Sequence, residues 1–120
     1  MTQEVVALTL EDIMPLRVKV LRKGTPVTHC NYPEDTYEDV IHLGVKNEST
    51  VVGTSSWFRK ECPDLVGEAA LQLKGMAVDD SLQGSGIGVQ IIVAGLALAT
   101  ERGVGIVWAR ARDSALGFYL

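Results

Sequence analysis

The chain of 120 residues lacks several features that mark particular classes of protein. Its two cysteines, Cys30 and Cys62, lie far apart and outside any Cys-x-x-Cys motif, so they are too few for a disulfide framework or a self-contained zinc site. Basic charge is not in excess, since the formal net charge is −4, which argues against a general nucleic-acid-binding protein. We therefore expect reduced thiols, no metal site and no nucleic-acid partner.

A membrane-spanning run and a secretion signal are also missing. The N-terminal segment has no basic region followed by an apolar run, as a signal peptide would have. Residues 81–100 carry no charge, but polar residues and four glycines interrupt them. A membrane span needs about 20 predominantly apolar residues. We expect a cytoplasmic protein with no membrane partner, folded as a single domain over residues 1–120.

What the chain does contain is an alternation of strand and helix patterns. The predicted strands are residues 2–9, 40–46, 50–58, 69–78 and 104–111, and the predicted helices are residues 10–24, 87–102 and the opening of another at 113–120. Thr9 and Asp12 form a helix start signal, and Gly24 and Gly103 are stop signals. Pro15 lies past the first turn and predicts a kink or a later start of the first helix.

The stretch "DDSLQGSGIG", residues 79–88, has three glycines in five positions between a predicted strand and a predicted helix. Such a junction favours anion binding, because the helix N-terminus offers unpaired N–H groups and glycine lets the backbone approach closely. A P-loop would need a lysine after the glycines, and a dinucleotide fingerprint would need glycine where Val89 stands. The pattern Q/R-x-x-G-x-G/A fits without a gap at Gln83, Gly86 and Gly88.

At these residues the sequence resembles the GNAT N-acetyltransferase superfamily. The segment "ARDSALGFYL" is similar to the family's A-x-x-F-Y segment, here Ala115, Phe118 and Tyr119, although Arg112 stands where the family often has asparagine. The resemblance implies an α+β GNAT acyltransferase fold, a mixed and mostly antiparallel sheet with splayed central strands flanked by helices. The family's final strands are expected to be absent after Leu120, and self-association into a homodimer or other homo-oligomer is expected to cover the open side of the sheet.

The resemblance also implies a function. The chain is expected to move the acetyl group of acetyl-CoA, its co-substrate, directly to a primary amine of a small-molecule or amino-acid-like acceptor. A non-catalytic acyl-CoA-binding sensor or assembly domain is the alternative. Tyr119 matches the family's tyrosine that protonates the departing thiolate, with a packing role as the other interpretation. The cofactor-binding positions carried over are Met76, Ala77 and Val78 beside the pantetheine arm and Gln83, Gly84, Ser85, Gly86, Ile87 and Gly88 around the pyrophosphate.

No general base stands out from the sequence. Asp35, Glu38 and Asp39 could face the acceptor groove, but solvated charges are the favoured interpretation, and a structural histidine is favoured for His42. Arg17 and Arg22 could hold a carboxylate of the acceptor, with an exposed helix face as the favoured alternative. Trp57 and Trp108 are expected in the core.

Overall fold

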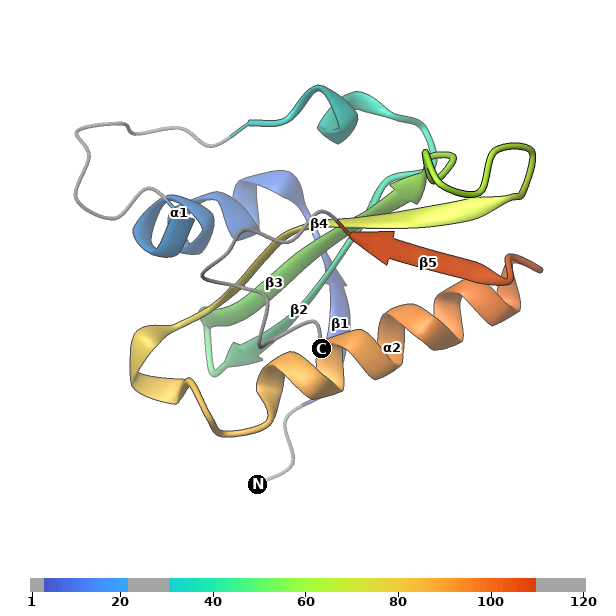
Figure 1. Cartoon of the computed structure of the whole chain (residues 1–120). Coiled ribbons are helices and arrows are strands. Elements are labelled where there is room, and N and C mark those ends of the chain that lie inside the picture. The colour runs from blue at the N-terminus through green and yellow to red at the C-terminus, as the bar shows by residue number, and fades with distance from the viewer. Residues whose placement is uncertain (1–3, 22–30, 110–120) are drawn as a thin grey trace.

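The fold is one five-stranded sheet with a helix on each face (Figure 1). The computed structural model describes residues 4–21 and 31–109. The sheet has the order β1-β2-β3-β4-β5, in which β5 is parallel to β4 and the other neighbours are antiparallel. The elements are β1 (Val5–Leu8), α1 (Leu10–Leu21), the 3-10 helix η1 (Pro33–Thr36), β2 (Ile41–Asn47), β3 (Thr50–Arg59), β4 (Ala70–Val78), the 3-10 helix η2 (Asp80–Leu82), α2 (Ile87–Glu101) and β5 (Ile106–Ala109). The mixed sheet confirms the predicted α+β class.

The start of α1 follows from its capping residues. The Thr9 hydroxyl accepts a hydrogen bond from the Asp12 N–H at 3.1 Å, and the Asp12 carboxylate accepts one from the Thr9 N–H at 3.2 Å. This reciprocal pair satisfies two backbone donors at the helix end. Pro15 lies inside the helix at an exposed position, so the prediction that the helix starts after Pro15 is wrong. The carbonyl that loses its helical donor belongs to Glu11, which is also exposed and can bind water.

The face of the sheet under α2 is apolar and closely packed. Trp57, Ile87 and Ile91 are fully or almost fully buried there. A Cβ atom added at Gly95 would lie 2.1 Å from the Trp57 ring, so only glycine lets α2 approach the sheet at this point. The helix ends as predicted, because Gly103 follows it with φ +71 and donates to the Thr100 carbonyl. This packing fixes where the N-terminus of α2 lies.

A β-bulge interrupts the pairing of β3 with β4. Ser56 lies opposite Lys74 and Thr54 lies opposite Ala77, so Gly75 and Met76 together face one residue of β3. Gly75 has φ +67, the left-handed conformation that glycine adopts without strain. The sequence predicted this strand without a bulge. The bulge turns the last residues of β4 relative to the first ones, close to where the strand enters residues 79–88.

The pairing of β4 with β5 runs from Ala70 opposite Ile106 to Leu73 opposite Ala109. Ala109 is the last residue that the structure describes. The predicted splaying, the predicted helix at 113–120 and the predicted absence of final strands concern later residues and stay predictions. Within residues 4–21 and 31–109, no helix is long and apolar enough to cross a membrane.

Candidate active site

Asp79 organises the entrance to the glycine turn, by which we mean residues 83–88. Its N–H donates to the Val52 carbonyl at 2.8 Å, and its carboxylate accepts from the N–H and hydroxyl of Ser81. Lys19 of α1 donates to the same carboxylate at 2.9 Å. The hydrogen bond from Lys19 is the largest cause that lowers the pKa of Asp79 from 3.8 to about 2. The Asp79 carboxylate is therefore paired with the Lys19 ammonium group and hydrogen-bonded to Ser81 in its own loop.

Two glycines of the turn have backbone conformations that favour glycine. Gly84 has φ +85 and Gly86 has φ +92, and a Cβ atom added at either would meet nothing within 4 Å. Gly86 precedes α2, and the first hydrogen bond of that helix runs from the Gln90 N–H to the Gly86 carbonyl at 3.0 Å. The N–H groups of Ile87 and Gly88 lie ahead of this bond. An open surface and helix N–H groups thus occur together, with no acidic residue in the first turn of α2.

The side chains of the turn point back toward the protein. Gln83 donates to the Asp80 carboxylate at 3.2 Å and to the Val78 carbonyl at 3.3 Å, and the Ser85 hydroxyl donates to the Leu82 carbonyl. These hydrogen bonds stabilise the turn and use its polar side chains, so the backbone of the turn is the surface that a ligand can contact. The arrangement fits the pyrophosphate of CoA, because backbone N–H groups and the helix dipole attract phosphate without a basic side chain.

Of the three predicted positions in β4, Met76 is the second residue of the bulge, and Ala77 and Val78 follow it toward the turn. Met76 and Val78 pack against the apolar cluster under α2, whereas Ala77 is buried opposite Thr54 on the other face. Their side chains are used in packing, so only their backbone groups could hold a cofactor arm. Tyr119, the predicted acid, lies outside the described residues, as do Arg22, Arg112, Ala115 and Phe118.

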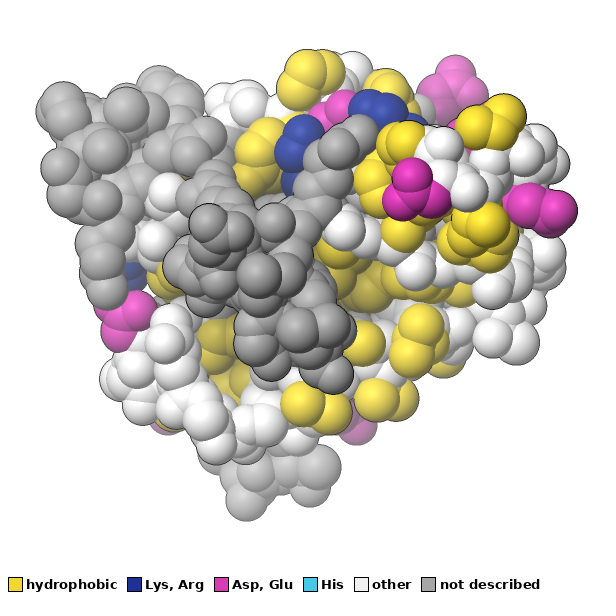
Figure 2. All heavy atoms as spheres, in the orientation of Figure 1, with side chains coloured by type: hydrophobic (Ala, Val, Ile, Leu, Met, Phe, Trp, Pro, Cys, Tyr) yellow, Lys and Arg dark blue, Asp and Glu magenta, His cyan; other side chains and the backbone are white. Residues whose placement is uncertain are grey.

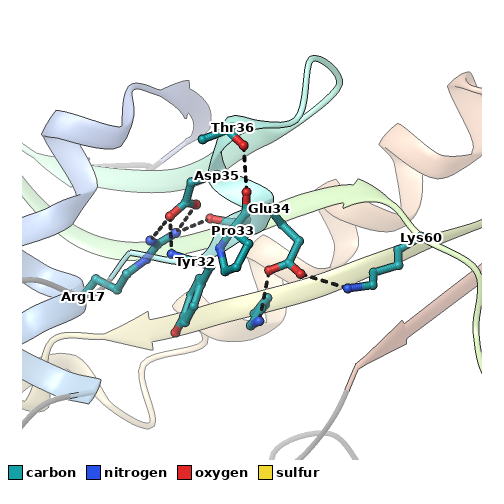
Figure 3. A network of polar contacts seen from close by, with 9 residues as sticks. Arg17, Tyr32, Pro33, Glu34, Asp35, Thr36 and Lys60 are labelled. Atoms are coloured by element: carbon teal, nitrogen blue, oxygen red, sulfur yellow. Dashed lines mark hydrogen bonds and ion pairs between the residues drawn. The ribbon is translucent and has the colours of Figure 1, made fainter.

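Arg17 is the centre of a polar network on the face of the sheet under α1 (Figure 3). It is completely buried, so the exposed helix face that we favoured for it was wrong. Its guanidinium donates to both carboxylate oxygens of Asp35, at 2.8 and 3.1 Å, and to the Ser56 hydroxyl at 2.7 Å. It also lies 4.6 Å from the centre of the Tyr32 ring. Arg17 does hold a carboxylate, but one that the protein itself supplies. The Asp35 side chain is only 3% exposed, so the solvated charge favoured for it is wrong.

His42 continues this network. Its Nδ1 lies 2.6 Å from the Ser56 hydroxyl, which also accepts from Arg17. The Ser56 proton is therefore free to be donated to Nδ1, which places the ring proton of neutral His42 on Nε2. Burial is the largest cause that holds the pKa of His42 below its ordinary value of 6.5. The structural role favoured for this histidine agrees with these contacts.

Glu34 is a member of the network that sequence reasoning missed. Its carboxylate accepts from Lys60 at 2.8 Å and from Lys74 at 3.1 Å, and Lys74 also lies 4.5 Å from the centre of the Tyr32 ring. The hydrogen bond from Lys60 is the largest cause that lowers the pKa of Glu34 from 4.5 to about 2. The signal in the sequence was "PEDT", a proline followed by acidic residues, which favours a helical turn. Glu34 remains ionised at neutral pH.

The remaining candidates have separate positions. Glu38 is exposed, and Asp39 accepts a hydrogen bond from the Arg59 N–H. Trp57 is in the core as predicted, whereas Trp108 is only partly buried and donates to the Lys60 carbonyl at 2.8 Å. Over the part of the chain that the structure describes, no group of three His, Cys, Asp or Glu residues could hold a metal ion.

Comparison with known proteins identifies the family of this fold and turn. The family model described as "Acetyltransferase (GNAT) family" matches residues 10–120. The uncharacterized N-acetyltransferase YitI of Bacillus subtilis (strain 168) is 31% identical over 116 residues, which cover 97% of this chain and 78% of that protein. The chain belongs to the GNAT acetyltransferase family. It is accordingly an acetyl-CoA-dependent acetyltransferase, as the resemblance predicted.

Solved structures confirm the GNAT fold. An acetyltransferase from Trypanosoma brucei superposes with a TM-score of 0.71 at 18% identity, covering 98% of this chain and 89% of that one. A glucosamine-6-phosphate N-acetyltransferase from Arabidopsis thaliana gives a TM-score of 0.72 at 15% identity, covering 99% and 88%. At these identities the likeness concerns the GNAT fold alone.

Proposed function

We propose that the chain transfers the acetyl group of acetyl-CoA directly to the primary amine of a small-molecule or amino-acid-like acceptor. One observation carries this proposal: the glycine turn presents an open backbone surface and helix N–H groups at the start of α2. That surface suits the pyrophosphate of CoA. Membership of the GNAT family supports the same cofactor.

In this proposal the backbone of residues 83–88 binds the pyrophosphate, and the backbone of Met76, Ala77 and Val78 lies beside the pantetheine arm. Bound acetyl-CoA supplies the thioester carbon that the amine attacks. A backbone N–H near Val78 polarises the thioester carbonyl and stabilises negative charge on its oxygen. The bond from the amine nitrogen to the acetyl carbon forms as the carbon–sulfur bond breaks, so no acyl-enzyme is needed.

Three proton transfers balance the reaction: the acceptor ammonium loses one proton before it attacks, its nitrogen loses a second as the amide forms, and the departing thiolate gains one. The second nitrogen proton passes through water to the residue that protonated the thiolate, which restores that residue. We assign protonation of the departing thiolate to Tyr119, since a phenol with a pKa near 10 is protonated at neutral pH. The acceptor ammonium must lose a proton before it attacks. Glu34 and Asp35 are held in ion pairs, and His42 is buried against Ser56. We therefore propose that the proton passes to water.

Thiol release from acetyl-CoA with a panel of primary amines tests this proposal. We expect amine-dependent release by the wild type, and a Tyr119→Phe variant whose kcat falls by roughly 10²-fold or less while its affinity for acetyl-CoA is unchanged. Binding of CoA without turnover on any amine would favour the acyl-CoA sensor. Equal turnover by the variant between about pH 6 and 9 would make Tyr119 a packing residue.

The other expectations about this protein stay predictions from the sequence. They are a single domain over residues 1–120, a cytoplasmic location, self-association, and the absence of metal, nucleic-acid and membrane partners.

A further inference from the structure

One ion pair joins the end of α1 to the loop that leads into the glycine turn. Lys19 lies in the last turn of α1, and Asp79 directly follows β4, 60 residues later in the chain. The Lys19 side chain is 58% exposed and the Asp79 side chain 16%. At the left edge of the space-filling view, an acidic and a basic side chain adjoin above a mainly white surface (Figure 2). The pair therefore lies at the surface, where solvent and ligands have access to it.

Three hydrogen bonds keep the glycine turn close to Asp79. The Leu82 N–H donates to the Asp79 carbonyl at 2.9 Å, and the Ser85 N–H donates to the Leu82 carbonyl at 3.1 Å. The Gln83 amide donates to the carbonyl of Val78, the residue before Asp79, at 3.3 Å. These bonds fold the loop back on the end of β4. A charge on Asp79 thus acts on the turn over a distance comparable to the Debye length, about 8 Å at physiological ionic strength.

Both partners of the pair are charged at neutral pH. The hydrogen bond between them is the largest cause that lowers the pKa of Asp79 to about 2 and raises the pKa of Lys19. The N-terminus of α2 offers only about half a positive charge to an anion. An unpaired carboxylate at Asp79 would outweigh that attraction, and it would add to the adjacent charge of Asp80, whose carboxylate accepts from Gln83. The ammonium group of Lys19 prevents this.

We propose, on the basis of the cofactor site proposed above, that Lys19 is a positioning residue for the pyrophosphate of CoA: by pairing with Asp79 it preserves the attraction of the glycine turn for this anion. Lys19 acts through Asp79 and does not contact the pyrophosphate itself. Like charges at close range repel, so the unpaired Asp79 carboxylate would weaken binding of the cofactor. An aspartate is tolerated beside the anion site because α1 supplies its counter-ion.

Calorimetric titration with CoA of the wild type, Lys19→Met, Asp79→Asn and the double variant tests the inference. Asparagine keeps an oxygen that can accept from Ser81, as Asp79 does. We expect Lys19→Met to raise the Kd for CoA by about 3- to 10-fold at low salt, as one unpaired charge at this distance gives. Asp79→Asn should bind CoA at least as tightly as the wild type.

The double variant should return to the wild-type affinity, because it lacks both charges and the two substitutions are coupled. A double variant as weak as Lys19→Met would mean that Lys19 contacts the anion directly. Weaker binding by Asp79→Asn alone would mean that the Asp79 carboxylate is needed for the shape of the loop. Either result would overturn the inference.

Arg102→Met is the matched control, since it removes another ion-paired cation and changes the net charge equally. Arg102 lies 3.9 Å from the Asp39 carboxylate and follows α2 at its far end. The 15 residues of α2 place it about 22 Å from the turn, beyond the Debye length. Its Kd for CoA should equal that of the wild type. An equal loss in Arg102→Met and Lys19→Met would assign the effect to net charge and contradict the inference.

Salt separates a charge effect from a structural one. Raising NaCl from about 50 to about 500 mM shortens the Debye length roughly threefold. The ratio of the Kd of Lys19→Met to that of the wild type should then fall toward one, and Lys19→Arg should bind like the wild type at both salt concentrations. A ratio that salt leaves unchanged would show that Lys19 supports the loop by packing, against the inference.

The titrations also distinguish this inference from the proposed transfer. Dephospho-CoA keeps the pyrophosphate but lacks the 3′-phosphate, so Lys19→Met should weaken binding of both ligands equally, and an effect on CoA alone would overturn the inference. The expected binding pattern without acetylation of any amine supports the inference while the transfer fails. Equal CoA affinity of the wild type and Lys19→Met overturns the inference and leaves the transfer standing. Absence of CoA binding by the wild type would overturn the cofactor site and this inference together.

Discussion

The two faces of the sheet are both buried, but they are built from different chemistry. Under α2, the buried cluster consists of Leu43, Val45, Val52, Trp57, Leu73, Ile87 and Ile91. Under α1, the buried groups on or above the sheet include Arg17, Glu34, His42, Thr54, Ser56 and Gln72. Strand β3 contributes to both faces, since Trp57 packs under α2 while Ser56 on its other side binds Arg17.

The apolar face and the polar face have different roles in the fold. Apolar packing under α2 holds that helix against the sheet and so fixes the glycine turn at its N-terminus. Burying charge under α1 is costly, because ions lose hydration that their partners only partly replace. The ion pairs there hold η1 over β4 beside the bulge. Stability thus depends on the shape of side chains on one face and on paired charges on the other.

Removing Arg17 should have the largest effect on stability. Arg17→Met leaves the Asp35 carboxylate, which is 3% exposed, without its bidentate partner. We expect the free energy of unfolding in urea at pH 7 to fall by about 3–5 kcal/mol. Adding Asp35→Asn should recover part of this loss, since no unpaired buried charge then remains. A loss below about 1 kcal/mol would mean that this face does not depend on paired charge.

Gly95→Ala tests the apolar face. The new methyl group would lie 2.1 Å from the Trp57 ring, which forces the helix or the ring to move. We expect a loss of about 1–3 kcal/mol in the free energy of unfolding, equal at pH 4 and pH 7 because no charge is involved. Gly105→Ala is the control, because a Cβ atom there meets nothing within 4 Å. Equal stability of the two variants would contradict the close approach of α2.

Acid should weaken the α1 face selectively. The pKa of Glu34 is lowered from 4.5 to about 2, so its ion pairs stabilise the fold fully above about pH 4.5 and are lost as the pH falls toward 2. In Glu34→Gln, the loss of stability over this window should be about 1–2 kcal/mol smaller, an amount limited by the partial exposure of the lysines. Urea unfolding at several pH values measures this. Parallel pH profiles for both proteins would refute it.

Thr54→Val should have the smallest effect and the opposite sign. The Thr54 hydroxyl is fully buried and has no hydrogen-bond partner within residues 4–21 and 31–109. Replacing an unpaired hydroxyl by a methyl group of similar size is expected to leave stability unchanged or to raise it by up to about 1 kcal/mol. The urea midpoint measures the change. A clear loss would show that this hydroxyl is paired in solution.

What the sequence predicted correctly depends on neighbouring residues. The cap at Thr9 and Asp12, the end of α2 before Gly103 and the junction at residues 79–88 each require only a few consecutive residues, so their pattern is visible in the chain. The order of strands and helices follows from similar local patterns, and the family resemblance extended them to the whole fold.

What the sequence did not predict depends on distant pairs. Arg17 binds Asp35, 18 residues away, and Glu34 binds Lys74, 40 residues away. The spacing of Ile13 and Leu16 marks the face of α1 that meets the sheet, but the charge of Arg17 favoured solvent because its partner Asp35 is not a sequence neighbour. The bulge at Gly75 was missed for the same reason, since it is defined by the register against β3.

Binding of CoA to the glycine turn is the central claim, and calorimetric titration with CoA tests it most directly. Gly86→Val is compared with Gly67→Val, because both glycines have φ +92 and open space around the Cβ position, but Gly67 lies in the loop before β4. We predict that the wild type and Gly67→Val bind CoA with the same affinity, while folded Gly86→Val shows no measurable binding, because its side chain occupies the surface offered to the pyrophosphate. Wild-type affinity in a folded Gly86→Val protein would contradict the account.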